Sequence, residues 1–206
     1  ERMGFWIDME NAYVTYENSY IEKLWGIIKK FHENKLLYED LKVLPWCARC
    51  GTALSSQEVA QGYQKVKEDS LFVKIKSKNF DNTYFLAWTT TPWTLPGNVA
   101  LAVNPDIDYV FSKIGEEIFI IAEARLEILG GNYEIIKKAK GKDLVGQEYE
   151  PLYKNNAPYK IVGENFVSVG DGSGIVHIAP AFGDDDFQVG KKNDLPVFHT
   201  TNEKGE

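Results

Sequence analysis

The chain has 206 residues, enough to bury a sizeable core in one domain or one and a half. Its 23 basic and 30 acidic residues give a formal charge of −7, which argues against a broad phosphate-binding surface. No apolar run approaches about 18 residues and no signal-peptide pattern opens the chain, so neither membrane insertion nor secretion is indicated and a cytoplasmic location is expected. The start at Glu1 and the polar end at residues 202–206 indicate a fragment of a larger protein.

The clearest helix signal covers residues 19–34. Ser19 and Glu22 form a capping-box pattern, Asn34 is a plausible stop, and the apolar positions between them fall on one face. Downstream of residue 70 short alternating runs predict strands at residues 71–76, 83–88, 99–103, 117–121, 133–136, 166–169 and 175–178. Short helices are predicted at residues 123–129 and from Asp184 to about Lys192. Many short strands with few helices favour an α+β, mainly β fold centred on a closed or nearly closed barrel with peripheral helices.

Cys47 and Cys50 form a CxxC motif followed by the turn-forming Gly51. Two thiolates at this spacing suit zinc, but a structural zinc needs four ligands. The histidines, which are His32, His177 and His199, are not paired at ligand spacing. The two thiols therefore form half of a metal site; a redox dithiol, for which no thioredoxin-like context follows, and a pair of inert thiols are the alternatives.

The segment Trp88–Asn98 follows an apolar run and crowds hydroxyl side chains around Pro92 and Pro96. Both prolines remove backbone donors, so the segment cannot continue as a central strand or pass through a helix interior. We expect a shaped loop at the rim of the sheet. Its threonines are stiff at χ1 and present donors and acceptors in few orientations, as a polar binding site requires, although a strand exit with solvated threonines fits the same residues.

A second polar cluster begins at the Gly172-Ser173-Gly174 turn. The following strand carries His177 and is broken by Pro180. A histidine in this position is often a core residue. The run Asp184-Asp185-Asp186 then stands at a predicted helix start, where aspartates commonly cap free N–H groups.

Four segments together resemble the editing insertion of isoleucyl-tRNA synthetases, in the order found in that family. WTTTPWTLPGN, residues 88–98, is similar to the threonine-rich editing peptide, and GSGIVHIAPAFGDDDF, residues 172–187, to the second editing peptide. Residues 46–66 resemble the half zinc ribbon at the edge of the insertion, and residues 4–25 the stretch that leads into it. The resemblance implies a connecting segment with a helix at residues 1–45, the half ribbon at 46–66 and a barrel-centred editing domain, of the type shared by valine, isoleucine and leucine enzymes, at 67–206.

The function implied by the resemblance is post-transfer editing, the hydrolysis of valine wrongly attached to isoleucine tRNA. The partners would be the tRNA(Ile) 3′ end carrying valine and the rest of the synthetase, with no membrane. Editing itself would need no cofactor, and ATP would serve only the synthetic domain. The zinc site would be completed by a second CxxC motif beyond residue 206. Related enzymes for leucine and valine carry an arginine where Thr91 stands, which favours isoleucine specificity.

The resemblance also assigns roles to single residues. Thr89, Thr90 and Thr91 would hold the terminal adenosine and the attacking water. Thr94, Asn98 and His177 would shape a pocket that admits valine and refuses isoleucine. Asp186 would pair with the α-ammonium of the aminoacyl group.

Some positions depart from the commonest family pattern. Ser173 stands where threonine is frequent, and Phe182 and Asp184 replace a histidine and a glutamine. Three alternative functions stay open at this point: the editing domain of a valyl- or leucyl-tRNA synthetase, a non-catalytic module that binds a tRNA 3′ end, and an aspartyl or cysteine hydrolase. The last lacks support, because neither Cys47 nor the three aspartates have a partner motif.

Overall fold

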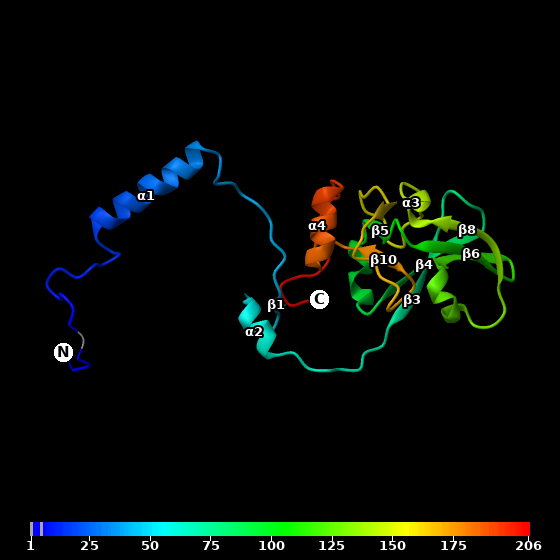
Figure 1. Cartoon of the computed structure of the whole chain (residues 1–206), viewed down its shortest axis with the longest axis horizontal. Coiled ribbons are helices and arrows are strands. Elements are labelled where there is room, and N and C mark those ends of the chain that lie inside the picture. Colours follow the sequence, from blue (N-terminus) through cyan, green and yellow to red (C-terminus); the bar gives the residue numbers. More distant parts are fainter. Residues whose placement is uncertain (1, 5) are drawn as a thin grey trace. The chain divides into compact units, whose positions relative to one another are not determined.

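The computed structural model describes residues 2–4 and 6–206 and divides the chain into two compact units, Glu1–Lys42 and Val43–Glu206 (Figure 1). The predicted boundaries at residues 45/46 and 66/67 stay a prediction. None of the helices in the described part is both long and apolar enough to cross a membrane.

The first unit is organised by helix α1, Asn18–Glu33. The helix begins before Ser19, because Tyr20 and Ile21 already donate their N–H groups to Glu17 O, so the capping box predicted at Ser19 is wrong. Asn34 ends the helix as predicted: its backbone N–H and its side-chain amide both donate to Lys30 O.

The second unit opens with a small hairpin of strands β1, Trp46–Cys47, and β2, Thr52–Ala53, followed by helix α2, Ser56–Gln61. Helix α2 was not predicted, although its start carries a clear signal. The Ser55 hydroxyl accepts from Glu58 N, and the Glu58 carboxylate accepts from Ser55 N, which completes a capping box.

An eight-stranded sheet forms the body of this unit, in the order β8-β6-β7-β4-β10-β5-β9 with β3 paired to β4. The strands are β3 Leu71–Lys76, β4 Thr83–Thr89, β5 Ala100–Val103, β6 Asp108–Ile114, β7 Glu117–Ala122, β8 Glu134–Lys140, β9 Lys160–Gly163 and β10 Ile175–Ile178. Helices are few: η1 Pro92–Gly97, η2 Glu123–Leu129, α3 Gly141–Leu144 and α4 Asp184–Lys192. The predicted mainly β fold with peripheral helices is thus confirmed.

Residues 147–150 connect strand β3 to strand β9. Glu150 N donates to Lys76 O at the end of β3, and Ile161 N on β9 donates to Gln147 O, both at 2.8 Å. Single bridges join Ser77 to Tyr149 and Glu148 to Lys160. Strands β3, β4, β10, β5 and β9 therefore form a nearly closed barrel, as the sequence predicted, and β7, β6 and β8 extend the sheet beyond β4.

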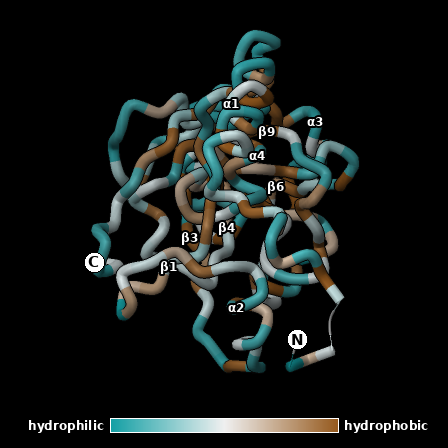
Figure 2. Tube along the Cα trace, turned by 90° about the vertical axis from the view of Figure 1, so that its left-hand side faces the viewer, coloured by the Kyte–Doolittle hydropathy of each residue, from teal (hydrophilic) through white to brown (hydrophobic). Residues whose placement is uncertain are grey.

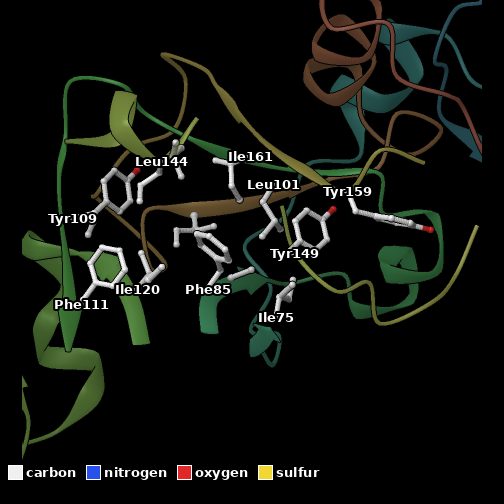
Figure 3. Close-up of a cluster of buried hydrophobic side chains, with 14 residues drawn as sticks. Ile75, Phe85, Leu101, Tyr109, Phe111, Ile120, Leu144, Tyr149, Tyr159 and Ile161 are labelled. Atoms are coloured by element: carbon white, nitrogen blue, oxygen red, sulfur yellow. The ribbon is translucent and has the colours of Figure 1, made fainter. Parts of the chain in front are cut away.

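One cluster of large apolar side chains, contributed by β6 and β7 as well as by the barrel strands, forms the main core of this unit (Figure 3). Figure 2 shows the hydrophobic residues of this unit concentrated in the strands. Burying each large side chain contributes about 1.5–3 kcal/mol before chain entropy is subtracted. The cluster includes the completely buried rings of Tyr109 and Tyr149, so tyrosine hydroxyls also lie in the interior and need partners there.

Two further predictions from local pattern are wrong. Residues 166–169 form no strand, and the carbonyls of Asn165 and Val167 accept from the Asn104 side chain instead. The threonine segment contains the short 3-10 helix η1, Pro92–Gly97, although its prolines were expected to exclude a helix interior. Pro92 occupies the first position, where no N–H is needed, and Pro96 lies inside the helix without a backbone N–H to donate.

Candidate functional site

The threonine segment and His177 meet because β4 and β10 are parallel neighbours (Figure 1). Val176 is in register with Trp88, so the carboxyl ends of both strands reach the same edge of the sheet. On its other side β10 pairs with β5, with His177 opposite Leu101. The sheet itself therefore brings together the two peptides that were predicted to form a site. Thr94 and His177, which are in contact, are 83 positions apart in sequence.

The central contact of the site joins Thr94 Oγ1 and His177 Nε2 at 3.0 Å, with both side chains buried. The Thr94 hydroxyl also donates to Thr91 O at 2.8 Å. Since its one proton is used there, Thr94 Oγ1 accepts the bond from an Nε2–H of the ring. This bonding pattern selects the tautomer that carries its proton on Nε2.

His177 is consequently a neutral ring held in one orientation. Its Nδ1 is buried and has no hydrogen-bond partner among the described residues. Burial lowers the pKa of His177 to about 4, because the imidazolium would lose its hydration. At neutral pH the ring therefore acts by shape and by hydrogen bonding, not by charge.

The threonine hydroxyls differ in their accessibility. Thr89 and Thr94 are buried, whereas Thr90 and Thr91 are half-buried. Thr89 Oγ1 accepts from Thr91 N at 3.0 Å, which fixes the bend between β4 and η1. The Thr91 hydroxyl lies between those of Thr89 and Thr94, at 3.4 and 3.5 Å. Thr90 and Thr91 are thus the two hydroxyls of the segment best placed to meet a ligand.

Asp186 lies in the first turn of α4 and points back to the exit of β10. Its Oδ2 accepts from Ala179 N at 2.9 Å, two residues after His177. Asp186 is half-buried, whereas Asp184 and Asp185 are exposed. Burial raises the pKa of Asp186 to about 6, against the lowering effect of the Ala179 N–H. The carboxylate is therefore distinguished from its two neighbours and is not bonded as a simple helix cap.

The second peptide also packs directly on the threonine segment. A Cβ atom added to Gly97, in the last turn of η1, would lie 2.9 Å from the Phe182 ring. Glycine at this position is what permits so close an approach. Phe182 thus packs against the end of η1, the helix that carries Thr94, at the carboxyl edge of β4 and β10.

Asn98, predicted to shape the pocket, directs its side-chain bonds into the protein. Its Nδ2 donates to Ala100 O at 2.8 Å and its Oδ1 accepts from Tyr149 Oη at 2.6 Å. Asn98 is buried, as is Tyr149, a residue that the sequence analysis did not single out. Nothing in the local sequence around Tyr149 signals this contact, because its partner lies 51 positions away.

The two cysteines lie on the β1–β2 hairpin and do not contribute to this site. Cys50 N is 3.4 Å from Cys47 Sγ, and Gly51, with φ of +67°, donates its N–H to Cys47 O. The backbone N–H of Cys50 lowers the pKa of Cys47, as is useful for a metal-binding thiolate. Among the residues that the structure describes, no group of three or more metal-binding side chains occurs, and the half metal site at Cys47 and Cys50 stays a prediction.

Comparison with known proteins decides the family. The family of class I tRNA synthetases for isoleucine, leucine, methionine and valine matches residues 1–181. The chain belongs to this family. Its residues are 53% identical over 209 positions to isoleucine–tRNA ligase from Clostridium acetobutylicum, covering 100% of this chain and 20% of that protein. The corresponding ligase of Picrophilus torridus is 47% identical over 208 positions, covering 98% and 20%.

The solved structures of synthetases agree on the fold. GlLeuRS-CP1 superposes with a TM-score of 0.53 at 21% identity, covering 60% of this chain and 59% of that one. The cytosolic leucyl-tRNA synthetase editing domain of P. knowlesi gives 0.53 at 17% identity, with 65% and 66% covered. The resemblance to isoleucyl-tRNA synthetases and to the editing fold of class I synthetases is confirmed. The chain spans about a fifth of the length of the curated relatives it matches.

Proposed function

We propose that the site at the carboxyl edge of β4 and β10 hydrolyses valine from mischarged tRNA(Ile). The observation that carries the proposal is the juxtaposition of the buried Thr94–His177 pair with the Asp186 carboxylate on one edge of the barrel. A site for an aminoacyl ester needs a pocket wall to contact the amino-acid side chain and an anion to pair with the α-ammonium, because every such ester has both groups. The identity to isoleucine–tRNA ligases over the whole chain supports the choice of isoleucine tRNA.

A second site is needed because a pocket built for isoleucine excludes valine poorly. One methylene is worth only about 1–3 kcal/mol, and the isoleucine synthetase is itself the reference example for this limit. The editing pocket must therefore sort by the opposite criterion. His177, held in place by Thr94 and neutral at physiological pH, supplies a rigid wall that valine clears and isoleucine meets.

The hydrolysis needs no enzyme nucleophile, because the ester carbonyl is already activated. Thr90 and Thr91 present half-buried hydroxyls that can hold the terminal adenosine and a water molecule. Thr89 fixes the bend that carries them. Asp186 pairs with the ammonium, and positioning of the water against the carbonyl supplies the larger part of the rate effect.

The other components of the reaction follow from the same proposal. The partners are the valine-bearing 3′ end of tRNA(Ile) and the rest of the synthetase. Editing uses no cofactor, and ATP serves the synthetic domain. Cys47 and Cys50, already on one tight turn, suit a structural zinc whose other two ligands come from another part of the synthetase.

The test is deacylation of pre-formed valyl-tRNA(Ile) by the synthetase that carries these residues. We expect release of valine at a rate far above that of the buffer, and isoleucyl-tRNA(Ile) to be resistant. Preference for threonyl- or norvalyl-tRNA would identify a valine or leucine enzyme instead. Tight binding of the charged 3′ end without hydrolysis would leave a non-catalytic binding module.

A further inference from the structure

We propose that Tyr149 is a positioning residue for the editing reaction, acting through Asn98 to fix the threonine segment against β10. The inference rests on the proposed deacylase function. Tyr149 lies in the segment that closes the barrel and contacts neither Thr94 nor His177 by any hydrogen bond among the described residues. Any effect of Tyr149 on the site would therefore be indirect, through Asn98.

The first step of the argument is the nature of the Tyr149–Asn98 contact. The Tyr149 hydroxyl is buried and donates to Asn98 Oδ1 at 2.6 Å, a short bond between two neutral groups. A phenylalanine would fill the same volume without a polar group to desolvate. An interior hydroxyl and amide are tolerated because each satisfies the other, so the pair fixes one orientation of the Asn98 side chain.

The second step is the position of Asn98 in the chain. Asn98 N donates to Leu95 O and closes the last turn of η1, while the next residue, Val99, donates its N–H to Ile178 O on β10. The side chain itself bonds to Ala100 O at the start of β5. Asn98 is thus the junction of the threonine segment with the two strands β10 and β5.

The third step connects this junction to the reactive geometry. Thr94 lies in η1 and His177 lies next to Ile178, so the 3.0 Å contact between Thr94 and His177 depends on how η1 is placed against β10. A second brace comes from the same side. Asn155 Nδ2 lies 3.5 Å from Pro96 O and 3.4 Å from Asn98 O, and Asn155 in turn is bonded to the Tyr159 hydroxyl.

The backbone conformation of Tyr159 supports a functional role for these contacts. Its φ of +47° places a bulky residue in the left-handed region, which is unfavourable unless the surroundings enforce it. The rings of Tyr149 and Tyr159 pack edge to face with centroids 5.8 Å apart, and Tyr149 N donates to Tyr159 O. The end of η1 is therefore braced by two side chains, Tyr149 and Asn155, of which Tyr149 makes the shorter and better buried contact.

The experiment compares Tyr149→Phe with Tyr109→Phe in the full synthetase. Tyr109 is the control, since it is equally buried and its hydroxyl donates to Gly174 O at 2.7 Å, at the opposite end of β10, while also accepting from Asn104 N at 3.0 Å. We expect Tyr149→Phe to lower kcat for valyl-tRNA(Ile) deacylation about tenfold or more with KM nearly unchanged, because small misplacements in a positioned site are costly. Tyr109→Phe should keep kcat within about twofold of the parent, although its decrease in Tm should be at least as large because two hydrogen bonds are lost.

A double-variant cycle separates positioning from general stability. If Tyr149 acts through Asn98, then Tyr149→Phe added to Asn98→Ala lowers kcat no further. Equal kcat losses in the two tyrosine variants, or a Tyr149→Phe effect that persists in full beside Asn98→Ala, would overturn the inference while the deacylase function stands. A parent enzyme that does not deacylate valyl-tRNA(Ile) would refute the proposed function, and this inference with it.

Discussion

The charge of Asp186 can be removed with little change to the structure around it. In Asp186→Asn the side-chain oxygen that accepts from Ala179 N is kept, while the carboxylate that we assign to the substrate ammonium is lost. Asp186→Ala would remove both and would also leave the Ala179 N–H unpaired. The asparagine variant is therefore the sharper test of the ammonium contact.

The size of the effect follows from the burial of the group. A hydrogen bond to a charged group contributes about 1.5–3 kcal/mol, and each 1.36 kcal/mol is a factor of ten in rate. With a pKa of about 6, Asp186 is largely ionised at pH 7, so almost the whole contribution is present there. We expect deacylation of valyl-tRNA(Ile) to slow by about 10- to 150-fold in Asp186→Asn.

The assay is single-turnover release of valine from pre-formed valyl-tRNA(Ile) by the full synthetase. Asp185→Asn is the matched control, because it makes the same change of charge on an exposed neighbour in the same helical turn. Its rate should equal that of the parent. The fold should be preserved in both variants, so thermal unfolding is recorded alongside. An Asp186→Asn enzyme within twofold of the parent, or one that melts far below it, would show that the carboxylate serves the structure and not the substrate.

Three further predictions follow from the same contacts. His177→Ala should relax size discrimination before it abolishes hydrolysis. The rate of isoleucyl-tRNA deacylation should rise by a larger factor than the rate of valyl-tRNA deacylation falls. If isoleucyl-tRNA stays as resistant as with the parent enzyme, His177 is only a core residue. The deacylation rate should rise with pH through about 6 as Asp186 ionises, since His177 with a pKa of about 4 stays neutral there, and Asp186→Asn should abolish this step. Gly174→Ala should lower stability by about 1–3 kcal/mol in denaturant unfolding, because φ is +76° and the new Cβ would meet Ala122 Cβ at 2.5 Å; an unchanged midpoint would contradict the strain.

Local pattern predicted the parts of the fold that local forces decide. Strand β3 has its predicted ends, because Val73 and Ile75 alternate with lysines that reach glutamates on the outside. Helix α4 also begins and ends where three aspartates and two lysines complement its dipole. Strands β6 and β9 were missed; β9 has only four residues, which pair with β5 on one side and contact residues 147–148 on the other. The residues at 166–169 alternate in burial like a strand but form none, and the distant Asn104 side chain donates to Val167 O in this stretch.

The candidate site shows the same division. The residue types of the threonine segment and the second peptide point to a polar site by themselves, and the resemblance supplied their roles. Periodicity has no means of placing Thr94 against His177, because the register of two parallel strands far apart in sequence brings them together. The role of Tyr149 could not be predicted for a further reason. In sequence it is not distinguishable from any other core aromatic residue, and only the structure shows that its hydroxyl bonds to Asn98.

Burial also reverses the roles that the two titratable residues of the site would have in water. A solvated histidine titrates near neutral pH and a solvated aspartate is ionised well below it. Here desolvation lowers the pKa of His177 to about 4 and raises that of Asp186 to about 6, so the carboxyl group and not the imidazole changes charge closest to neutrality. A substrate ammonium beside Asp186 would favour the carboxylate and oppose the effect of burial, whereas a neutral valine side chain beside His177 would leave the ring uncharged. His177 thus provides an uncharged wall that can select by size, and Asp186 an anion that a charged ligand would stabilise. Hydrolysis of an aminoacyl ester requires both functions.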